Sequence, residues 1–236
     1  MYTRKKLFVV SDVHGHCTLL QRALAEAGFD KENPEHLLIC CGDYFDRGEE
    51  NVEVLKFFER LKHSVLLRGN HEDLLLKLLD TGRILPHNYI NGTIQTLQNF
   101  FGTRAIDPST NTVDFTGKTR TVDRLCEFIG ETLDYFETEN YVFVHGWIPC
   151  ENYAEATPEQ WEEARWLKWS TQYTGEPPIP GKTLVCGHYP VFFAVQFDPD
   201  RTLRSTEIFY GNGLCAIDAG TYDSGCINVL VLEDEV

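Results

Sequence analysis

Short runs of consecutive apolar residues alternate with helical patterns along the first third of the chain. The apolar runs are Leu7–Val10, Leu37–Cys41 and Val65–Leu67, and the helical patterns are Leu19–Ala27, Val52–Leu61 and Glu72–Leu79. Because strands and helices alternate at this spacing, the pattern predicts a parallel βαβαβ sheet with right-handed crossovers. The apolar runs contain no alternating polar residues, which is typical of strands that are buried on both faces.

The rest of the chain is less regular and ends in predicted strands. Residues 86–140 are rich in Thr, Asn and Gly, with a helix expected around Leu125–Phe136, and residues 150–182 contain three tryptophans. We expect one domain over residues 1–236, in which these two stretches are excursions that fold over the sheet edge. The further predicted strands are Tyr141–Val144, Thr183–Cys186, Val191–Phe197, Leu214–Ile217 and Ile227–Leu232.

The composition is that of a soluble globular protein. The net charge of −15 argues against binding a nucleic-acid polymer, which requires a concentrated basic face. The first apolar run ends at Val10, which is too short for a secretory signal, and no stretch approaches the length of a membrane span. The eight cysteines include no CxxC pair, which favours buried thiols in a reducing compartment. We therefore expect a cytoplasmic protein.

Five apolar runs end in polar residues that can bind metal ions. With their ends, these runs read LFVVSDVHG, LICCGDYFDRG, VLLRGNHE, YVFVHG and LVCGH. In open α/β sheets, ligand sites form where the carboxyl ends of neighbouring strands meet, so these polar side chains are expected to converge. The glycines beside them suit sharp turns and close approach of the backbone. The candidate ligands are Asp12, His14, Asp43, Asn70, His145 and His188.

The chemistry of these candidates favours a pair of metal ions. Carboxylate, imidazole and amide ligands without thiolates suit manganese, iron or zinc. Six ligands are too many for one ion, whereas two ions about 3.5–4 Å apart with a shared carboxylate would use all of them. Each candidate has an ordinary alternative when taken singly: Asp12 or Asn70 could cap a helix, and His145 could lie in a turn. The recurrence of the same ligand types at five strand ends favours the metal site.

The segments DVHG, GDYFDRG, RGNHE, HG and GH, in this order, resemble the signature of the PPP-type metallophosphatases. This group belongs to the calcineurin-like metallophosphoesterases and includes serine/threonine protein phosphatases and bacterial symmetrical diadenosine tetraphosphatases. The resemblance spans Asp12 to Gly220, and Asn91–Thr96 also resembles a segment of small bacterial and phage members. It implies an α/β fold in which two sheets form a sandwich flanked by helices.

The resemblance also implies roles for the matching residues. His71 matches a general acid, Asp46 the residue that orients it, and Arg47 an arginine that binds the phosphate. Two divalent ions are implied, with manganese expected and iron or zinc as alternatives. The implied ligands are Asp12, His14 and Asp43 for the first ion, and Asp43 again with Asn70, His145 and His188 for the second.

The sequence departs from the family pattern near the expected substrate mouth. Ser11 stands where glycine is usual, Trp147 follows His-Gly, and Tyr189 stands where threonine is common. A second phosphate-binding arginine of the family falls in the segment ARWLKW, which offers Arg165 or Lys168. The planar fork of arginine matches phosphate oxygens, so Arg165 is the expected contact, although an arginine packed structurally among tryptophans is a comparable alternative.

The expected activity is hydrolysis of phosphoserine or phosphothreonine in proteins. The alternative substrate is a dinucleoside polyphosphate, whose bases would stack on aromatic side chains. A third hypothesis is a scaffold that binds phosphorylated partners without turnover, but such a protein has no need of an acid pair such as Asp46 and His71. The oligomeric state stays open. The aromatic candidates for base stacking are Tyr89, Trp147, Trp161, Trp166 and Tyr189.

Overall fold

A four-stranded sheet forms the first half of the computed structural model, which describes residues 4–197, 202 and 205–236. Its strand order is β11–β1–β2–β3, and β1, β2 and β3 run parallel while β11 pairs antiparallel with β1. The predicted parallel arrangement of the first third is therefore confirmed. The strands are β1 (Arg4–Val10), β2 (His36–Cys40), β3 (Ser64–Leu66) and β11 (Leu230–Glu235).

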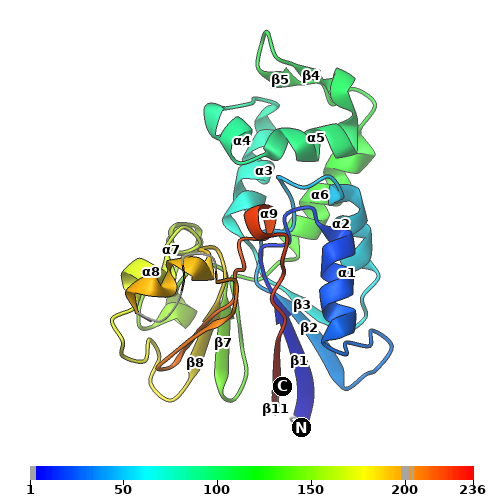
Figure 1. Cartoon of the computed structure of the whole chain (residues 1–236). Coiled ribbons are helices and arrows are strands. Elements are labelled where there is room, and N and C mark those ends of the chain that lie inside the picture. Colours follow the sequence, from blue (N-terminus) through cyan, green and yellow to red (C-terminus); the bar gives the residue numbers. More distant parts are fainter. Residues whose placement is uncertain (1–3, 198–201, 203–204) are drawn as a thin grey trace.

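A second, five-stranded sheet lies beside the first (Figure 1). Its order is β6–β7–β8–β10–β9, with β7, β8 and β10 parallel and the two edge strands antiparallel to their neighbours. The α/β fold with two sheets and flanking helices is confirmed. The strands are β6 (Tyr135–Glu137), β7 (Tyr141–Val144), β8 (Thr183–Cys186), β9 (Phe209–Gly211) and β10 (Leu214–Ala216).

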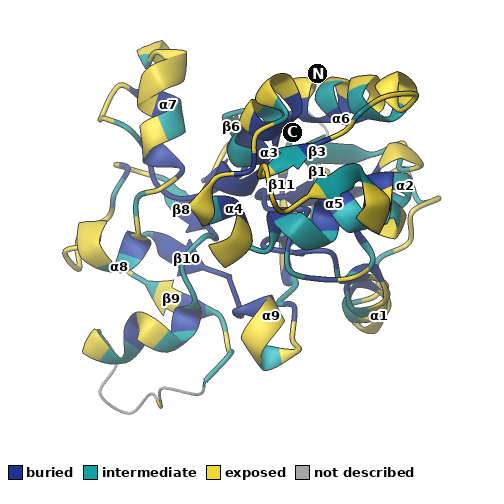
Figure 2. Ribbon diagram, turned by 90° about the horizontal axis from the view of Figure 1, so that it is seen from above, coloured by how far each residue is buried: buried dark blue, intermediate teal, exposed yellow. Residues whose placement is uncertain are grey.

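The two sheets bury a shared apolar layer between them. Leu7 and Val9 of β1 pack in this layer with Phe143 of β7 and Val185 of β8. The intervening residues of β1, such as Phe8, point to the other face and pack against helices. Both faces of the central strands are therefore covered, which explains why their sequences do not alternate with polar residues. Seen from above, buried residues fill the middle of the molecule and exposed ones the outer helices (Figure 2).

Helices cover the outer face of each sheet. The first sheet packs against α1 (Cys17–Glu26), α2 (Asn51–Glu59), α3 (Asn70–Thr81) and α6 (Thr119–Gly130). The second sheet packs against the helices α7 (Pro158–Ala164) and α8 (Trp169–Gln172) and against two 3-10 helices, η2 (Tyr153–Glu155) and η3 (Val191–Gln196). The short helix α9 (Thr221–Ser224) follows β10.

The excursion over residues 86–140 is more helical than its composition suggests. It extends beyond the strand ends at the top of Figure 1 and then returns through α6 to β6. Amphipathic spacing accounts for its longer helices, because Leu97 and Phe101 of α5 are buried one turn apart. The excursion begins with α4 (Pro86–Ile90), α5 (Thr93–Phe101), η1 (Thr103–Ala105), β4 (Ile106–Asp107) and β5 (Thr112–Val113).

The predicted strand Val191–Phe197 is wrong. The segment forms η3, with Val191 and Ala194 buried at a helical spacing of three residues. Pro190 precedes it, and a proline has no N–H to donate to a sheet. The Val191 N–H instead donates to the carbonyl of Asp218, which ties η3 to the segment after β10.

Two further boundaries differ from the sequence prediction. The helix expected around Leu125–Phe136 is α6, which ends at Gly130, and Tyr135 already belongs to β6. The strand expected at Ile227–Leu232 starts later, at Leu230, and continues to Glu235. The pairing with β1 sets these bounds. Val9 pairs with Leu230, and Arg4 pairs with Glu235, so the strand continues through the charged residues at the end of the chain.

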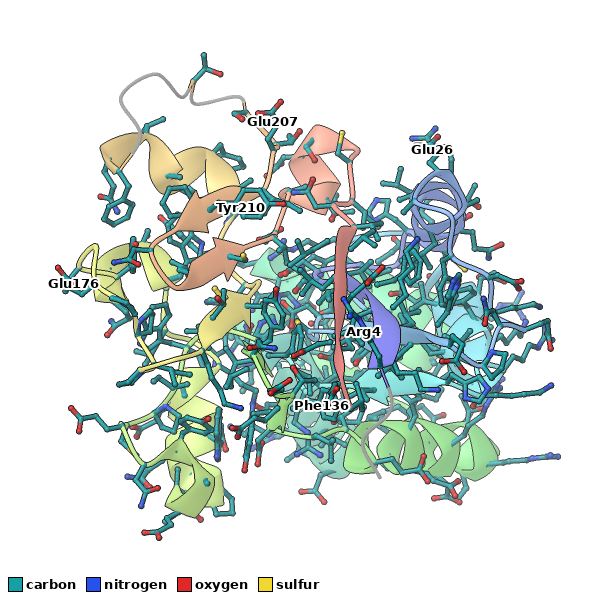
Figure 3. The ribbon with its side chains drawn as sticks, turned by 90° about the horizontal axis from the view of Figure 1, so that it is seen from below. Arg4, Glu26, Phe136, Glu176, Glu207 and Tyr210 are labelled. Carbon is teal, nitrogen blue, oxygen red and sulfur yellow. The ribbon has the colours of Figure 1, made fainter. Side chains whose placement is uncertain are left out.

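The start of β1 and the end of β11 lie side by side at the edge opposite the carboxyl ends of the parallel strands. Arg4 forms an exposed ion pair with Glu233 of β11 at 3.0 Å. Viewed from below, Arg4 lies near the middle, while Glu26 on α1 and Glu176 lie on opposite sides (Figure 3). In the part of the chain that the structure describes, every helix is too short or too polar to cross a membrane.

Candidate metal centre

Side chains from both sheets converge at the carboxyl ends of their strands. The first sheet contributes four of the six sequence-predicted ligands, and β7 and β8 contribute the other two. All are buried except His188, which is half-buried. The structure brings together the complete set predicted at the strand ends: Asp12 and His14 after β1, Asp43 after β2, Asn70 at the start of α3, His145 after β7 and His188 after β8.

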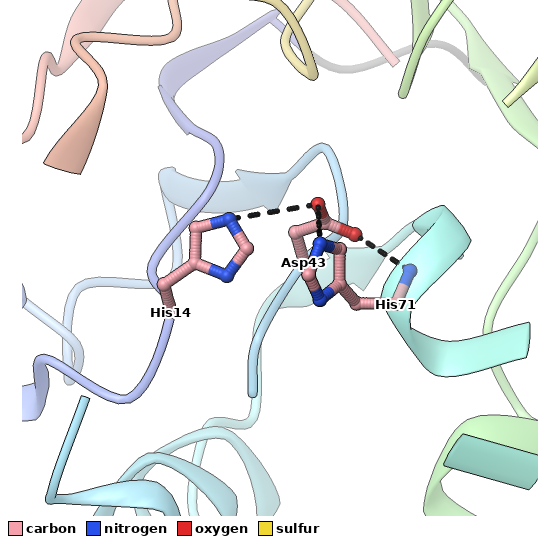
Figure 4. A group of neighbouring side chains, drawn as sticks. All are labelled: His14, Asp43 and His71. Carbon is pink, nitrogen blue, oxygen red and sulfur yellow. Dashed lines mark hydrogen bonds and ion pairs between the residues drawn. The ribbon is translucent and has the colours of Figure 1, made fainter. Parts of the chain in front are cut away.

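The carboxylate of Asp43 lies at the centre of this cluster. Its Oδ2 lies 3.7 Å from His14 Nε2 and 3.8 Å from His71 Nε2 (Figure 4). Its Oδ1 lies 3.5 Å from His145 Nε2. Metal–ligand bonds of about 2.0–2.2 Å place two ligands of one ion roughly 3–4 Å apart. Asp43 therefore belongs to two groups of possible ligands, one with His14 and His71 and one with His145 and His188.

Asp12 and Asn70 lie against these groups. Asp12 Oδ1 is 3.9 Å from His14 Nε2, and Asn70 Oδ1 is 2.8 Å from His145 Nε2. The other oxygen of Asp12 accepts hydrogen bonds from the Ser11 hydroxyl at 2.5 Å and from the backbone N–H of His188 at 2.9 Å. Ser11, which departs from the family pattern, therefore helps to orient a candidate ligand.

Backbone carbonyls orient the two most buried imidazoles. His14 Nδ1 donates to the carbonyl of Phe45 at 2.9 Å, and His145 Nδ1 donates to that of Cys41 at 2.7 Å. A carbonyl oxygen can only accept, so each Nδ1 carries a proton, and in a neutral ring the lone pair of Nε2 then faces the cluster. Burial lowers the pKa of both rings well below the usual value, which keeps them neutral. Neutral imidazoles with inward Nε2 atoms are the form that binds metal ions.

Negative charge is crowded into the same buried space. Burial raises the pKa of Asp43 and of Asp218 well above the usual range, and the neighbouring Asp12 adds to both shifts. Buried carboxylates at this density require a cation or a proton to be stable. The donor set of carboxylates, an amide oxygen and neutral imidazoles therefore fits divalent metal ions.

His71, which also borders Asp43, pairs with Asp46 on the side away from the strand ends' other ligands. His71 Nδ1 lies 2.8 Å from Asp46 Oδ2, and both side chains are buried. Burial alone would lower the pKa of His71, but the carboxylates of Asp43 and Asp46 reverse this and raise it to about 9. Arg47 Nη2 lies 3.3 Å from His71 Nε2. The three residues assigned to acid catalysis and phosphate binding are thus adjacent in the structure.

Two hydroxyls from the excursion hold Asp46 in place. Thr96 Oγ1 donates to Asp46 Oδ1 at 2.6 Å, and Thr93 Oγ1 donates to Asp46 Oδ2 at 2.8 Å. Both threonines belong to α5 and are fully buried. The sequence segment Asn91–Thr96 was noted only as a resemblance, so this structural role was missed. The spacing of three residues, which places both hydroxyls on one helix face, was the available signal.

The loops that carry the site have unusual backbone conformations. Six candidate site residues have positive φ, a region that side chains other than glycine rarely occupy. Positions of this kind cost on the order of 1–3 kcal/mol each and persist only when the surroundings hold them. Among the described residues, just one further non-glycine residue, Asn111, shares this conformation. The six are Asp12, His14, Asp43, Asp46, Arg47 and His188.

Two glycines are required because carboxylates approach them closely. A Cβ on Gly69 would lie 2.1 Å from Asp43 Oδ1, and one on Gly187 would lie 1.9 Å from Ser11 Oγ and 2.4 Å from Asp12 Oδ2. None of these three distances is physically possible for a side chain. The sequence prediction that glycines beside the strand ends permit close approach is therefore confirmed at these positions.

Glu72 is a structural carboxylate that sequence reasoning missed. Its two oxygens accept backbone hydrogen bonds from Asp43 at 2.9 Å, Tyr44 at 3.0 Å and Gly69 at 2.9 Å. Burial nevertheless raises its pKa to about 7. Glu72 thereby joins the loop after β2 to the start of α3. Its place in RGNHE was visible in the sequence, but the motif alone does not show what it contacts.

The two cations of the tryptophan-containing segment have different surroundings. Arg165 is buried, with Nε 2.6 Å from Asp73 Oδ2 and Nη1 2.7 Å from Asp134 Oδ1. Lys168 is exposed, and its Nζ lies 4.7 Å from the centre of the Tyr189 ring. These ion pairs agree with the structural alternative for Arg165, while its contact with a substrate phosphate stays a prediction.

The aromatic residues proposed to bind a nucleobase differ in their exposure and contacts. Trp147 and Trp161 are buried in the core of the second sheet, and Trp161 stacks on Tyr135. Tyr89 lies on α4, where its hydroxyl donates to Asn111. Trp166 is 44% exposed, and its ring centre is 6.1 Å from that of His188. Tyr189, which directly follows His188, is half-buried against the core of the second sheet.

Comparison with known sequences supports a phosphoesterase family. A sequence model of the calcineurin-like phosphoesterases matches residues 5–217. Serine/threonine-protein phosphatase 2 of Escherichia coli strain K12 is 36% identical over 78 residues, which cover 33% of this chain and 34% of that protein. A symmetrical bis(5'-nucleosyl)-tetraphosphatase of Xanthomonas axonopodis pv. citri is 33% identical over 73 residues, covering 30% and 23% respectively. The chain thus matches about a third or less of the length of these curated relatives.

Comparison with solved structures shows the same fold. A protein serine/threonine phosphatase from Saccharomyces cerevisiae superposes with a TM-score of 0.55 at 14% identity, over 98% of this chain and 80% of that one. A metallophosphoesterase from Sphaerobacter thermophilus gives a TM-score of 0.54 at 14% identity, over 98% and 88%. At this level of identity the likeness concerns the fold and not the substrate.

Proposed function

Because this chain belongs to the calcineurin-like phosphoesterase family, we propose that it hydrolyses phosphoserine and phosphothreonine in proteins at a centre of two divalent metal ions. Membership of the family makes it a metal-dependent phosphoesterase. The observation that carries the two-ion proposal is the position of Asp43, whose carboxylate belongs to both ligand groups. A shared carboxylate of this kind is the usual device for holding two ions close together.

The proposed ligands divide between the two ions. Manganese is the proposed metal, with iron or zinc as alternatives, because the donors are oxygen and imidazole nitrogen without thiolate. When bound, the ions supply a nucleophile at neutral pH, since coordination lowers the pKa of water from about 15.7 to about 7. Asp12, His14 and Asp43 are assigned to one ion, and Asp43, Asn70, His145 and His188 to the other.

The acid pair completes the proposed reaction. His71 protonates the leaving oxygen of the alcohol through Nε2, while Asp46 fixes the proton of the other ring nitrogen, Nδ1, at 2.8 Å. Arg47, beside Nε2, binds the phosphate oxygens and stabilises the charge that they develop. This pair also argues against a scaffold that only binds phosphorylated partners, which would gain nothing from a buried, oriented acid.

The relatives with known names fall into two substrate classes. The E. coli relative is named as a serine/threonine protein phosphatase and the Xanthomonas relative as a symmetrical tetraphosphatase. A dinucleoside polyphosphate is therefore kept as the second candidate, favoured by the exposed Trp166 beside His188. We also propose a cytoplasmic location, because all eight cysteines are free thiols.

Metal content tests the shared carboxylate directly. We expect Asp43→Asn to lose both ions in elemental analysis and to lose turnover, because each ligand group contains Asp43. The matched control is Asp80→Asn, which makes the same change at an exposed position on α3 and should keep both ions. Retention of either ion by Asp43→Asn would contradict the bridging role. Phosphoserine peptide and diadenosine tetraphosphate, assayed side by side with Mn²⁺, distinguish the two substrate classes.

A further inference from the structure

A groove of about 410 Å³ lies between α1 and α2, which run next to each other in Figure 1. None of the described residues that line it is a candidate metal ligand or a member of the acid pair. Small organic molecules occupy sites of about 300–1,000 Å³ in proteins. The groove therefore has the size of a small-molecule site and is separate from the metal centre.

Apolar side chains form the floor of the groove. Leu24 of α1 is buried there, and Phe29, Phe57 and Leu61 are half-buried. Phe29 packs edge-on against Phe8 of β1 with ring centres 5.2 Å apart, so the floor is continuous with the core of the first sheet. An apolar surface that stays open to water in this way favours contact with the apolar body of a ligand.

The two helices are held together at their N-terminal ends. Glu50, which precedes α2, accepts a hydrogen bond from the backbone N–H of Thr18 in α1 at 2.8 Å, and its own N–H donates to the carbonyl of Gly15 at 2.8 Å. The lining of the groove extends from Cys17 in the first turn of α1 to Leu61 after the end of α2. Because these hydrogen bonds fix the spacing of the helices, the groove is preformed.

Three cations line the same groove. Lys56 and Arg60 lie one turn apart at the C-terminal end of α2, and Lys31 lies in the segment between α1 and β2. Among the described lining residues, Glu53 is the one acid. None of the three cations has a described carboxylate within ion-pair distance. The groove thus combines an apolar floor with an excess of positive charge.

The acidic residues near these cations are paired with other partners. The pairs are Arg22 with Glu26, Lys62 with Glu32, and Arg124 with Glu59. The negative end of the α2 dipole accounts for cations at the end of this helix, but it does not account for Lys31. In a chain of net charge −15, this local excess of positive charge runs against the overall composition. It is complementary to an anionic ligand.

We propose that the groove between α1 and α2 binds a small organic anion, whose apolar body lies on the aromatic floor and whose anionic group lies among Lys31, Lys56 and Arg60. The anionic group is a carboxylate or a phosphate, because ammonium and guanidinium groups bind the oxygens of both through charge-assisted hydrogen bonds. The inference does not depend on the proposed hydrolysis, and its test requires no turnover.

Two fluorescent dyes separate the effect of charge from that of apolar contact. Anilinonaphthalene sulfonate carries one anionic group on an aromatic body, and phenylnaphthylamine has the same rings without the anionic group. In fluorescence titrations we expect the chain to bind the sulfonate about tenfold more tightly than the neutral dye, as for a charge-assisted contact. This preference should decrease as ionic strength increases, because Lys31 and Arg60 are exposed to solvent.

A double substitution tests the charge of the groove. Lys56→Gln together with Arg60→Gln should remove the preference for the sulfonate and keep the binding of the neutral dye, because the apolar floor is unchanged. The matched control is Lys118→Gln together with Arg120→Gln, which removes two exposed cations at the start of α6 and should change neither affinity.

A larger side chain tests the space of the groove. Ala25 is exposed on α1 and lines the groove, so Ala25→Trp places an indole in it and should abolish the binding of both dyes. The matched control is Ala154→Trp, which makes the same change at an exposed position of η2 and should keep both affinities.

Displacement of the bound sulfonate identifies the anionic group. Decanoate tests a carboxylate and decyl phosphate tests a phosphate, and the stronger competitor names the group. The inference is overturned if neither displaces the dye, if the wild-type chain binds both dyes equally, or if the double glutamine variant is folded by circular dichroism and keeps the preference. If that variant does not fold, Ala25→Trp decides, because retained binding of both dyes excludes the groove. The proposed function is unaffected by each of these outcomes.

Discussion

The threonine hydroxyls that hold Asp46 provide the most direct test of the proposed acid pair. Thr96 Oγ1 donates to Asp46 Oδ1, and both side chains are fully buried. Valine has nearly the shape of threonine but lacks the hydroxyl. Thr96→Val therefore removes a hydrogen bond to a charged group with little change in packing volume.

The expected cost follows from the contacts of Asp46. A hydrogen bond to a charged group contributes about 1.5–3 kcal/mol, and Asp46 Oδ1 has no other donor among the described hydrogen bonds. The Asp46 N–H also donates to Thr96 at 2.9 Å, but it keeps a second acceptor, Asn51 Oδ1, at 3.0 Å. The loss is therefore confined to one oxygen, and we expect the free energy of unfolding to fall by about 2 kcal/mol.

The same change should affect catalysis selectively. With Oδ1 released, the Asp46 carboxylate can rotate away from His71, whose orientation depends on Oδ2 at 2.8 Å. We expect kcat for phenyl phosphate, a poor leaving group, to fall about tenfold, as for the partial loss of a general acid. p-Nitrophenyl phosphate should lose much less, because its leaving group departs without a proton.

Urea unfolding and steady-state kinetics measure both effects. The control is Thr119→Val at an exposed position on α6, which should change the free energy of unfolding by less than about 0.5 kcal/mol. The reasoning is refuted if Thr96→Val stays within the same 0.5 kcal/mol and lowers kcat equally for both aryl phosphates. That outcome would mean that the α5 hydroxyls neither stabilise Asp46 nor orient the acid.

Further predictions concern the acid, a close approach and a buried phenol. His71→Asn should lower kcat by roughly 10²–10⁴ on poor leaving groups and much less on p-nitrophenyl phosphate, and an equal loss on both would exclude a general acid. Gly187→Ala should abolish metal binding in elemental analysis, because its Cβ would lie 2.4 Å from Asp12 Oδ2. Burial and the hydrogen bond to Glu137 raise the pKa of Tyr153 from 10.0 to about 12. Between these two pH values the folded state keeps the phenol proton while the unfolded chain loses it. The free energy of unfolding, measured with urea, should therefore fall as the pH rises from 10.0 to about 12, and should fall less in Tyr153→Phe.

The sequence predicted the candidate ligands better than the contacts around them, because each ligand comes directly after a recognisable strand. Buried runs such as Leu7–Val10 are recognisable by apolarity alone, and the residue after a strand end lies at the site wherever the parallel strands meet. The two-sheet arrangement came from the family resemblance, but the parallel βαβαβ half and the convergence of the six candidate ligands could be predicted from the pattern. Their division between two ions came from family resemblance and stays a prediction.

Contacts that depend on tertiary structure were not predictable in this way. The valine and phenylalanine residues of Val191–Phe197 favoured a strand. The segment is helical instead, because Pro190 has no N–H for a sheet and the Val191 N–H donates to the carbonyl of Asp218. Lys168 and Arg165 carry the same charge three residues apart, and nothing in the sequence shows that Asp73 and Asp134 would occupy one of them. Glu72 likewise shows its partners only in the folded chain.

The positive φ angles of the site imply that activity and stability are opposed in this protein. At positions such as Asp46 (φ 73°) and Arg47 (φ 66°), glycine would relax the backbone while removing the side chain that the chemistry requires. A search for more stable variants would therefore tend to select inactive ones, with the gains concentrated in these loops. The strands beneath these loops are buried on both faces, and their packing holds the strained backbone in place.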